Sequence, residues 1–149
     1  YEMTSSLVGS EMCIRDSADA DQPVIAAGGG GIPVMEQGSH LKGASAVIEK
    51  DRAAGLLAKE LDADVLMFIT GVPNVVLNYG SDHPINIDKM TTADAARYAE
   101  EGHFKTGSML PKVESSIDFI NAGKGRRAII TSLDGAKSAL AGKGGTTIQ

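Results

Sequence analysis

Short apolar runs alternate with stretches of helical periodicity along most of this 149-residue chain. Apolar runs of this kind are typical of strands buried on both faces of a parallel sheet. Strands that alternate with helices form such sheets, so the pattern predicts an α/β fold. The runs expected as strands are "PVIAA" at 23–27, "VLMFIT" at 65–70, "RRAIITS" at 126–132 and "GTTI" at 145–148. The segment 74–87 is predicted to form a small β-excursion with a turn at 80–84.

The expected helices carry local start and stop signals. Thr91 is typical of a helix cap, an acidic residue follows in the first turn, and Gly102 lies just past the end. In another segment Val113, Ile117 and Ile120 fall on one face of a helix. The helices are expected at 51–63, 91–101, 111–123 and 133–142.

Four consecutive glycines, Gly28, Gly29, Gly30 and Gly31, follow the first apolar run. Glycine loses more conformational freedom on folding than any other residue. Four in a row therefore indicate either a turn too sharp for side chains or a backbone that a ligand approaches closely. Ligands bind at the carboxyl ends of strands in such sheets, and glycine amides can face a phosphate there. The run completes neither a P-loop nor a dinucleotide fingerprint, so both interpretations stay open.

Two lysines lie beside expected helix starts, Lys50 before the first helix and Lys112 in the first turn of another. A cation there faces the positive end of the helix dipole, which costs about 0.3–1 kcal/mol. A shared anion explains both positions, and with the glycine amides it predicts a phosphate site. Asp51, next to Lys50, is either a helix N-cap or a counter-charge that holds the lysines in place.

Composition excludes several other classes of protein. The net charge of -5 argues against a nucleic-acid surface. The single cysteine, Cys13, excludes an intramolecular disulfide and a cysteine metal cluster, and the sequence indicates no other metal site. No apolar run is long enough to span a membrane, and the start lacks the layout of a signal peptide. We therefore expect no membrane or nucleic-acid partner and a cytoplasmic location.

The first 17 residues differ in character from the rest. They show no clear helical or strand period, and "SLVGSEMCIRDS" resembles a conceptual translation of sequencing-adapter DNA. We expect residues 1–17 to be a non-native or disordered tail, and residues 18–149 to form the folded part. A natural disordered terminus is the alternative.

Four segments, "VIAAGGGGIPV", "AVIEKDRAAGLLAKELDAD", "EEGHFKTGSMLPKVE" and "RRAIITSLDGAKSALAGKGGTTI", resemble the carbamate kinases of the amino acid kinase superfamily. The resemblance implies a three-layer αβα sandwich with a mainly parallel sheet. It implies phosphoryl transfer between ATP and carbamate, which gives carbamoyl phosphate and ADP. In many organisms that reaction runs towards ATP at the end of arginine fermentation, the arginine deiminase pathway. Mg²⁺ with ATP or ADP, and a homodimer, are also implied.

The resemblance assigns roles to the residues already singled out. The family's "DKD" corresponds to Glu49, Lys50 and Asp51, with the first acid conservatively replaced. Lys50 is implied to contact the transferred phosphate, Asp51 to orient lysines, and Lys112 to stabilise charge on the moving phosphoryl group. The four glycines would lie near the phosphoryl acceptor.

Nucleotide contacts are implied for two further segments. Gly107, Ser108 and Met109 of "GSML" would line the nucleotide phosphates. The family's "TDVDGVYLNYG" appears here as "TGVPNVVLNYG", with Gly71 in place of an acid and Pro73-Asn74 in place of Asp-Gly. The positions implied to contact the nucleotide in this segment are Thr70, Gly71, Val72 and Asn74.

Carbamate kinase chains are considerably longer, and the resemblance implies that the part missing here is N-terminal. Residues 18–149 would then be the C-terminal, mainly nucleotide-binding part of an incomplete domain. Phosphoryl transfer depends on positioning both partners, so we expect this chain alone to be inactive. Two alternatives remain: another phosphotransferase of the same fold, and a nucleotide-binding module without catalysis.

Overall fold

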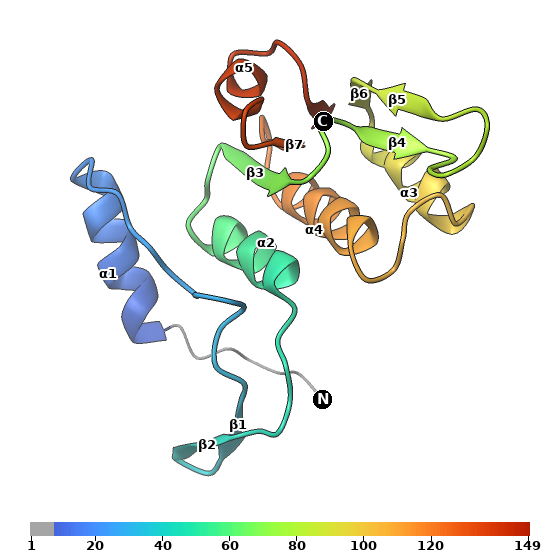
Figure 1. Cartoon of the computed structure of the whole chain (residues 1–149). Helices are drawn as coiled ribbons and strands as arrows, with labels where there is room; N and C mark the ends of the chain where they lie inside the picture. The colour runs from blue at the N-terminus through green and yellow to red at the C-terminus, as the bar shows by residue number, and fades with distance from the viewer. Residues whose placement is uncertain (1–7) are drawn as a thin grey trace.

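The computed structural model describes residues 8–149, and its central feature is a four-stranded sheet (Figure 1). The elements are α1 (Val8–Asp19), β1 (Val34–Gln37), β2 (His40–Gly43), α2 (Lys50–Glu60), β3 (Val65–Thr70), β4 (Val75–Leu77), β5 (Ile85–Ile87), β6 (Lys89–Met90), α3 (Thr92–Glu100), α4 (Met109–Asn121), β7 (Arg127–Ser132), α5 (Ala136–Leu140) and β8 (Thr146–Ile148).

The sheet has the strand order β3-β7-β8-β6. Strands β3 and β7 are parallel and pair Leu66 with Ala128 and Phe68 with Ile130. Strands β6 and β8 are also parallel, whereas β7 and β8 are antiparallel. The sheet is therefore mixed and mostly parallel, which confirms the predicted α/β class.

Helices cover both faces of this sheet. Figure 1 shows α2 and α4 side by side on one face, with α5 on the other. The main core lies under α2 and α4, where Val113 and Phe119 of α4 meet Phe68 and Ile130 of the strands. These four side chains are at most 5% exposed. The three layers agree with the expected αβα sandwich, which is partial here.

Local signals predicted several elements correctly. Helix α3 begins with a capping box. The Thr91 hydroxyl donates to the Asp94 carboxylate and accepts from the Asp94 backbone N–H. Gly102 follows its end with a φ of +79°, which suits glycine. The excursion forms as the antiparallel pair β4–β5, a sheet of its own.

The expected strand at 23–27 is wrong. No strand forms there, and Val24 and Ile25 are 42% and 101% exposed. An apolar run becomes a strand only where a neighbour completes its hydrogen-bond ladder, and the described chain pairs nothing with this one. The hairpin β1–β2, by contrast, was not expected.

The tail also differs from the expectation over part of its length. Residues 8–17 belong to helix α1, although the sequence showed no helical period there. The guanidinium of Arg15 donates to the carbonyl of Glu60 at the end of α2. Residues 1–7 lie outside the described residues, and the non-native origin of the stretch stays a prediction. No helix among the described residues is long and apolar enough to cross a membrane.

Removing one methylene group from a buried residue of β7 tests how tightly this strand is packed. Ile130 is fully buried, so Ile130→Val should lower the free energy of unfolding by about 1 kcal/mol. Ile69 on β3 is 45% exposed, and Ile69→Val should change the free energy of unfolding by less than about 0.5 kcal/mol. Urea unfolding of the two variants measures both values, and equal losses would contradict the burial pattern described here.

Candidate functional site

Two helix N-termini meet at the carboxyl edge of the sheet. Helix α4 packs along β7 and leads directly into it, so the helix runs opposite to the strand and begins where the strand ends. Helix α2 stands in the same relation to β3. The two helices are therefore parallel, with their positive dipole ends side by side. This is the edge at which sheets of this class bind ligands.

A buried ion pair joins the two N-termini. The Lys112 ammonium donates to Oδ2 of Asp51 at 2.6 Å, and both side chains are less than 10% exposed. The ammonium also lies 5.9 Å from the centre of the Phe68 ring. Lys50 Nζ lies 3.5 Å from the same Asp51 oxygen, but this side chain is 60% exposed. One carboxylate oxygen thus faces two cations, one buried and one in solvent.

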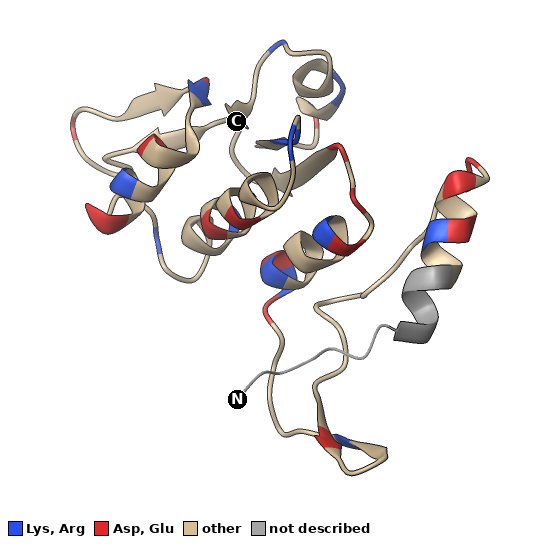
Figure 2. Cartoon of the chain, turned by 180° about the vertical axis from the view of Figure 1, so that it is seen from behind, with Lys and Arg blue, Asp and Glu red and all other residues tan. Residues whose placement is uncertain are grey.

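Asp51 is a counter-charge and not the helix cap. The cap of α2 is Glu49, whose carboxylate accepts from the backbone N–H groups of Asp51 and Arg52 at 2.8 and 2.9 Å. Of the two interpretations of Asp51, the structure supports the one in which it holds lysines. Figure 2 shows charges of both signs close together at the start of α2.

The charges at the start of α2 perturb each other's titration. Partial burial raises the pKa of Glu49, but hydrogen bonds from Arg52 N–H and the Lys50 ammonium outweigh it and hold that pKa below its ordinary value. The hydrogen bond to Glu49, with the charge of Asp51, raises the pKa of Lys50 above its ordinary value. Both groups are therefore charged at neutral pH.

The glycine loop lies against the chain that enters α2. A Cβ added to Gly30 would lie 2.3 Å from the carbonyl oxygen of Ile48 and 3.4 Å from the nitrogen of Lys50. Gly28, Gly30 and Gly31 all have positive φ. The run thus serves a sharp turn and a close backbone approach, and it brings the loop beside Lys50.

The amides of this loop are largely engaged within it. Gly28 N–H donates to the carbonyl of Ala26, and the N–H groups of Gly30 and Gly31 both donate to that of Ala27. In this conformation these three amides face the loop itself and not a ligand. A phosphate contact from the glycine run therefore stays a prediction.

The start of α4 is open. Ser108 is its N-cap residue but makes no side-chain capping hydrogen bond. Gly107 and Ser108 are exposed and Met109 is half-buried. The first turn also contains Pro111, which has no N–H. The N–H groups of Ser108 and Leu110 both donate to the carbonyl of Lys105, so these two amides face the turn itself. The positive end of the helix dipole and the exposed glycine suit an anion, and the phosphate role of "GSML" stays a prediction.

The segment after β3 lies at the same edge. Thr70 ends the strand and is half-buried, Gly71 is exposed and Val72 is half-buried. The Asn74 amide donates to the carbonyl of Ile87 and to Oδ1 of Asp88, at 3.3 and 3.1 Å. Asn74 therefore fixes the start of the β4–β5 excursion, and its nucleotide contact stays a prediction.

Two features at or near these helices escaped the sequence analysis. Arg52 of α2 and Glu114 of α4 form an ion pair at 2.7 Å, although 62 positions separate them and no local spacing signals it. The side chain of Arg126 is only 7% exposed, and no local pattern in the sequence signals its burial. Its guanidinium stacks on Phe119 and donates to the carbonyl of that residue near the end of α4.

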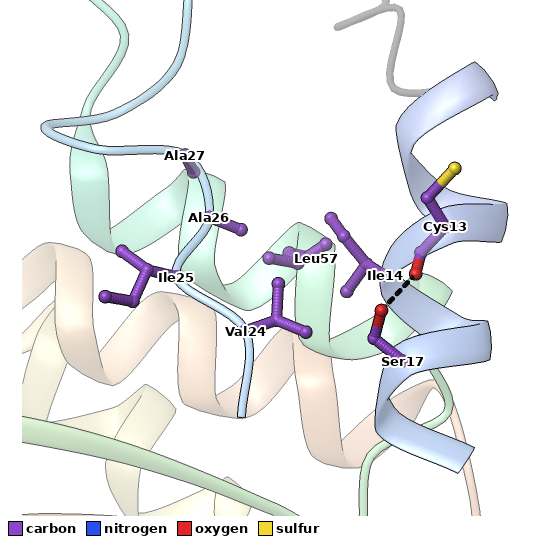
Figure 3. Close-up of a pocket in the computed structure, with 8 residues that line it drawn as sticks. All are labelled: Cys13, Ile14, Ser17, Val24, Ile25, Ala26, Ala27 and Leu57. Atoms are coloured by element: carbon purple, nitrogen blue, oxygen red, sulfur yellow. Dashed lines mark hydrogen bonds between the residues drawn. The ribbon is translucent and has the colours of Figure 1, made fainter. Parts of the chain in front are cut away.

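An apolar cavity of about 360 Å³ lies elsewhere, between α1, residues 24–27 and α2. Figure 3 shows Ile14 of α1, Val24 and Leu57 of α2 facing one another across it. None of the lysines or carboxylates described above lines it. This cavity is therefore separate from the charged edge of the sheet.

The described residues bring no three His, Cys, Asp or Glu side chains together as ligands for a metal ion. The carboxylates nearest the site are Glu49 and Asp51, and both already accept from lysine or backbone donors. The exposed polar group that this edge offers a ligand is the Lys50 ammonium, which suits an anion.

The sequence of this chain is similar to those of several known proteins. The amino acid kinase family model matches residues 8–132. A carbamate kinase-like protein of Escherichia coli is 49% identical over 135 residues, 91% of this chain and 44% of that protein. A carbamate kinase of Thermococcus kodakarensis is 50% identical over 125 residues, 84% of this chain and 39% of that protein.

Among solved structures, a carbamate kinase from Giardia lamblia bound to AMP-PNP matches with a TM-score of 0.89 at 40% identity. The match covers 93% of this chain and 44% of that one. The chain thus spans less than half the length of these relatives.

The cap of α2 predicts an acid-sensitive contribution to stability. The pKa of Glu49 is lowered in the folded chain, so its charge stabilises the fold above the unfolded-state pKa, and the contribution is lost as the pH falls through the folded-state pKa. Between about pH 5 and pH 3 the wild type should therefore lose more stability than Glu49→Gln. Urea unfolding at each pH measures this. Glu36→Gln, at an exposed position of β1, is the control and should follow the wild type.

The glycine loop offers a matched pair of substitutions. Gly30→Ala forces a Cβ against the Ile48 carbonyl at a φ of +140°, and should cost about 1–3 kcal/mol of stability. A Cβ at Gly29 meets nothing within 4 Å, so Gly29→Ala should be close to neutral. Unfolding midpoints of the two variants decide the matter; similar midpoints would show that the close approach at Gly30 is absent in solution.

Proposed function

The chain belongs to the amino acid kinase family, and on that premise we propose that it is the mainly nucleotide-binding part of a carbamate kinase. Such an enzyme transfers a phosphoryl group between ATP and carbamate. The observation that carries the proposal is the shared Asp51 oxygen, which holds Lys112 and Lys50 at two adjacent helix N-termini. The similarity of 49–50% to a carbamate kinase-like protein and a carbamate kinase supports this substrate over others of the family.

Lys112 supplies a fixed positive charge for the transferred group. Phosphoryl transfer needs little covalent chemistry from a protein, because charge spread over the phosphoryl oxygens must be stabilised in one position. A buried ammonium held by a 2.6 Å contact to Asp51 is already oriented for that task. The start of α4 adds its dipole in the same place.

Lys50 supplies the second charge. Its ammonium lies at the same carboxylate but in solvent, so it can turn towards an anion that approaches the edge. A lysine in solvent is protonated at neutral pH, so Lys50 keeps its charge while it does so. Asp51 is a positioning residue in this scheme, because it contacts the lysines and not the phosphoryl group.

The nucleotide would lie along the edge formed by the "GSML" turn and the segment after β3. Gly107 and Ser108 leave the α4 N-terminus open to the phosphates, and Thr70 to Val72 line the adjoining strand end. The Giardia relative was solved with AMP-PNP, which supports ATP binding by the whole protein. Mg²⁺ would arrive on the nucleotide phosphates and supply charge neutralisation, since Mg²⁺ is usually held by one or two carboxylates together with substrate phosphates.

The remaining expectations belong to the whole protein. We propose that it acts as a homodimer in the cytoplasm and in arginine metabolism, as the resemblance implied. A phosphotransferase of the same fold with another acceptor, and a nucleotide-binding module without catalysis, are the alternatives that the following assay separates.

The proposal is tested by joining residues 23–149 to the N-terminal part of the Thermococcus kodakarensis carbamate kinase that this chain does not match. The fused protein is offered carbamate, acetylglutamate and UMP in turn with Mg–ATP, and ADP release is measured. Transfer to carbamate alone supports the proposal. Transfer to another acceptor supports a sister kinase, and nucleotide binding without any transfer supports the non-catalytic module.

The two lysines predict a specific loss of rate in the fused protein. Lys112→Ala and Lys50→Ala should each lower kcat by roughly 10²- to 10⁴-fold, since each removes a charge contact made in the transition state. Lys59→Ala, at the far end of α2, is the matched control and should keep the parent rate. Wild-type kcat in either of the first two variants refutes the catalytic role.

Lys112→Ala also leaves the buried Asp51 without its main partner, so part of its effect can arise from misfolding. Circular dichroism and the thermal midpoint of each variant identify that part. The exposed Lys50 carries no such complication, and loss of rate in Lys50→Ala at an unchanged midpoint isolates the charge effect.

A further inference from the structure

Two ion pairs cross the contact between α2 and α4, and they differ in environment. Asp51 and Lys112 form the first at 2.6 Å, with both side chains less than 10% exposed. Arg52 and Glu114 form the second at 2.7 Å, with side chains 65% and 40% exposed. We call these two pairs, with the Gly55–Ser115 contact below, the α2–α4 seam.

The two pairs lie on different sides of the α2 axis. Asp51 and Arg52 are consecutive, and consecutive helical residues point about 100° apart. Asp51 points to the core side of the seam and Arg52 to the solvent side. The Asp51 pair and the core contact of Ala58 hold the buried side of α2. The Arg52 pair adds an attachment on the solvent side, which opposes a roll of α2 against α4.

Gly55 sets how closely the two helices approach. A Cβ added at this position would lie 2.9 Å from the Cβ of Ser115 and 3.5 Å from its hydroxyl oxygen. Both residues are buried. The two helices are therefore in close contact one turn beyond the ion pairs, and α2 has little room to move along α4.

Rotation of α2 would move the Asp51 carboxylate, which holds the Lys112 ammonium of α4. A side-chain tip lies about 5–6 Å from a helix axis, so a roll of roughly 20° moves it by about 2 Å. That displacement is large beside a 2.6 Å contact between Asp51 and Lys112. A misplacement of about 1 Å can reduce a rate by as much as 10²-fold.

We propose that Arg52 and Glu114 are positioning residues, which lock the rotation of α2 so that Asp51 holds the Lys112 ammonium in place. The effect on phosphoryl transfer rests on the proposed function, whereas the effect on the ammonium does not. An exposed ion pair contributes little to stability, so this role is distinct from holding the fold together.

The test uses the full 149-residue chain with ¹⁵N-labelled lysine. The Lys112 ammonium signal is assigned by its absence in Lys112→Ala, and its proton exchange rate reports the contact with Asp51. In Glu114→Gln we expect that exchange to become about tenfold faster, with the thermal midpoint within about 2 °C of the wild type, as for a surface substitution. The reversed pair Arg52→Glu with Glu114→Arg should restore slow exchange.

Glu101→Gln is the matched control, because Glu101 is 45% exposed, lies 3.7 Å from Arg97 and is the C-cap residue of α3, outside the seam. It should leave the Lys112 signal unchanged. Unchanged exchange in Glu114→Gln overturns the proposal. So does a faster exchange that the reversed pair fails to restore, or one that comes with a large fall in the thermal midpoint.

The fused protein then adds the kinetic readout. Glu114→Gln should lower kcat by about three- to thirtyfold and leave KM for ATP within about twofold, because the ammonium and not the nucleotide site is displaced. An unchanged kcat overturns the catalytic part of the proposal. A fused protein without any transfer activity contradicts the proposed function instead, and the lysine signal still decides the role of the seam.

Discussion

The contact between Asp51 and Lys112 is the interaction on which the charged edge of this molecule depends. A buried charge without a partner is costly, so each of these side chains requires the other. The pair can form only if α2 and α4 start at the same edge of the sheet and run in the same direction. Two helix dipoles then point their positive ends at one place, and the carboxylate of Asp51 offsets that concentration of positive potential.

Glycine makes this arrangement sterically possible at two points on α2. Gly30 lets the glycine loop touch the chain that enters the helix, and Gly55 lets α4 approach its flank. Both positions need glycine for steric reasons, because the Cβ of any other residue would collide with a neighbouring atom. The start of α2 is thus enclosed by backbone on one side and a helix on the other, and only its solvent side remains open for Lys50.

Elements with strong local signals were predictable from the sequence, and those that depend on distant partners were not. Strands β3 and β7 and helix α3 carry their own apolar runs and caps. The run at 23–27 has the composition of a strand, but a strand also needs a neighbour, which the described chain does not provide. Arg52 and Glu114 meet only because two helices far apart in sequence pack together. The sequence left open whether Asp51 caps α2 or holds the lysines, because its spacing does not show that the Glu49 side chain reaches the amides of the first turn.

The unequal exposure of the two lysines around Asp51 has a consequence for reorganisation. When an anion enters, Lys50 can leave the carboxylate by rotating its flexible, hydrated side chain. The buried Lys112 stays in contact with Asp51. The carboxylate keeps a cation in both situations, so no buried charge is uncovered at any stage. Under the proposed function, such an edge would accept and release a highly charged group by the movement of the exposed Lys50 side chain, with its helices in place.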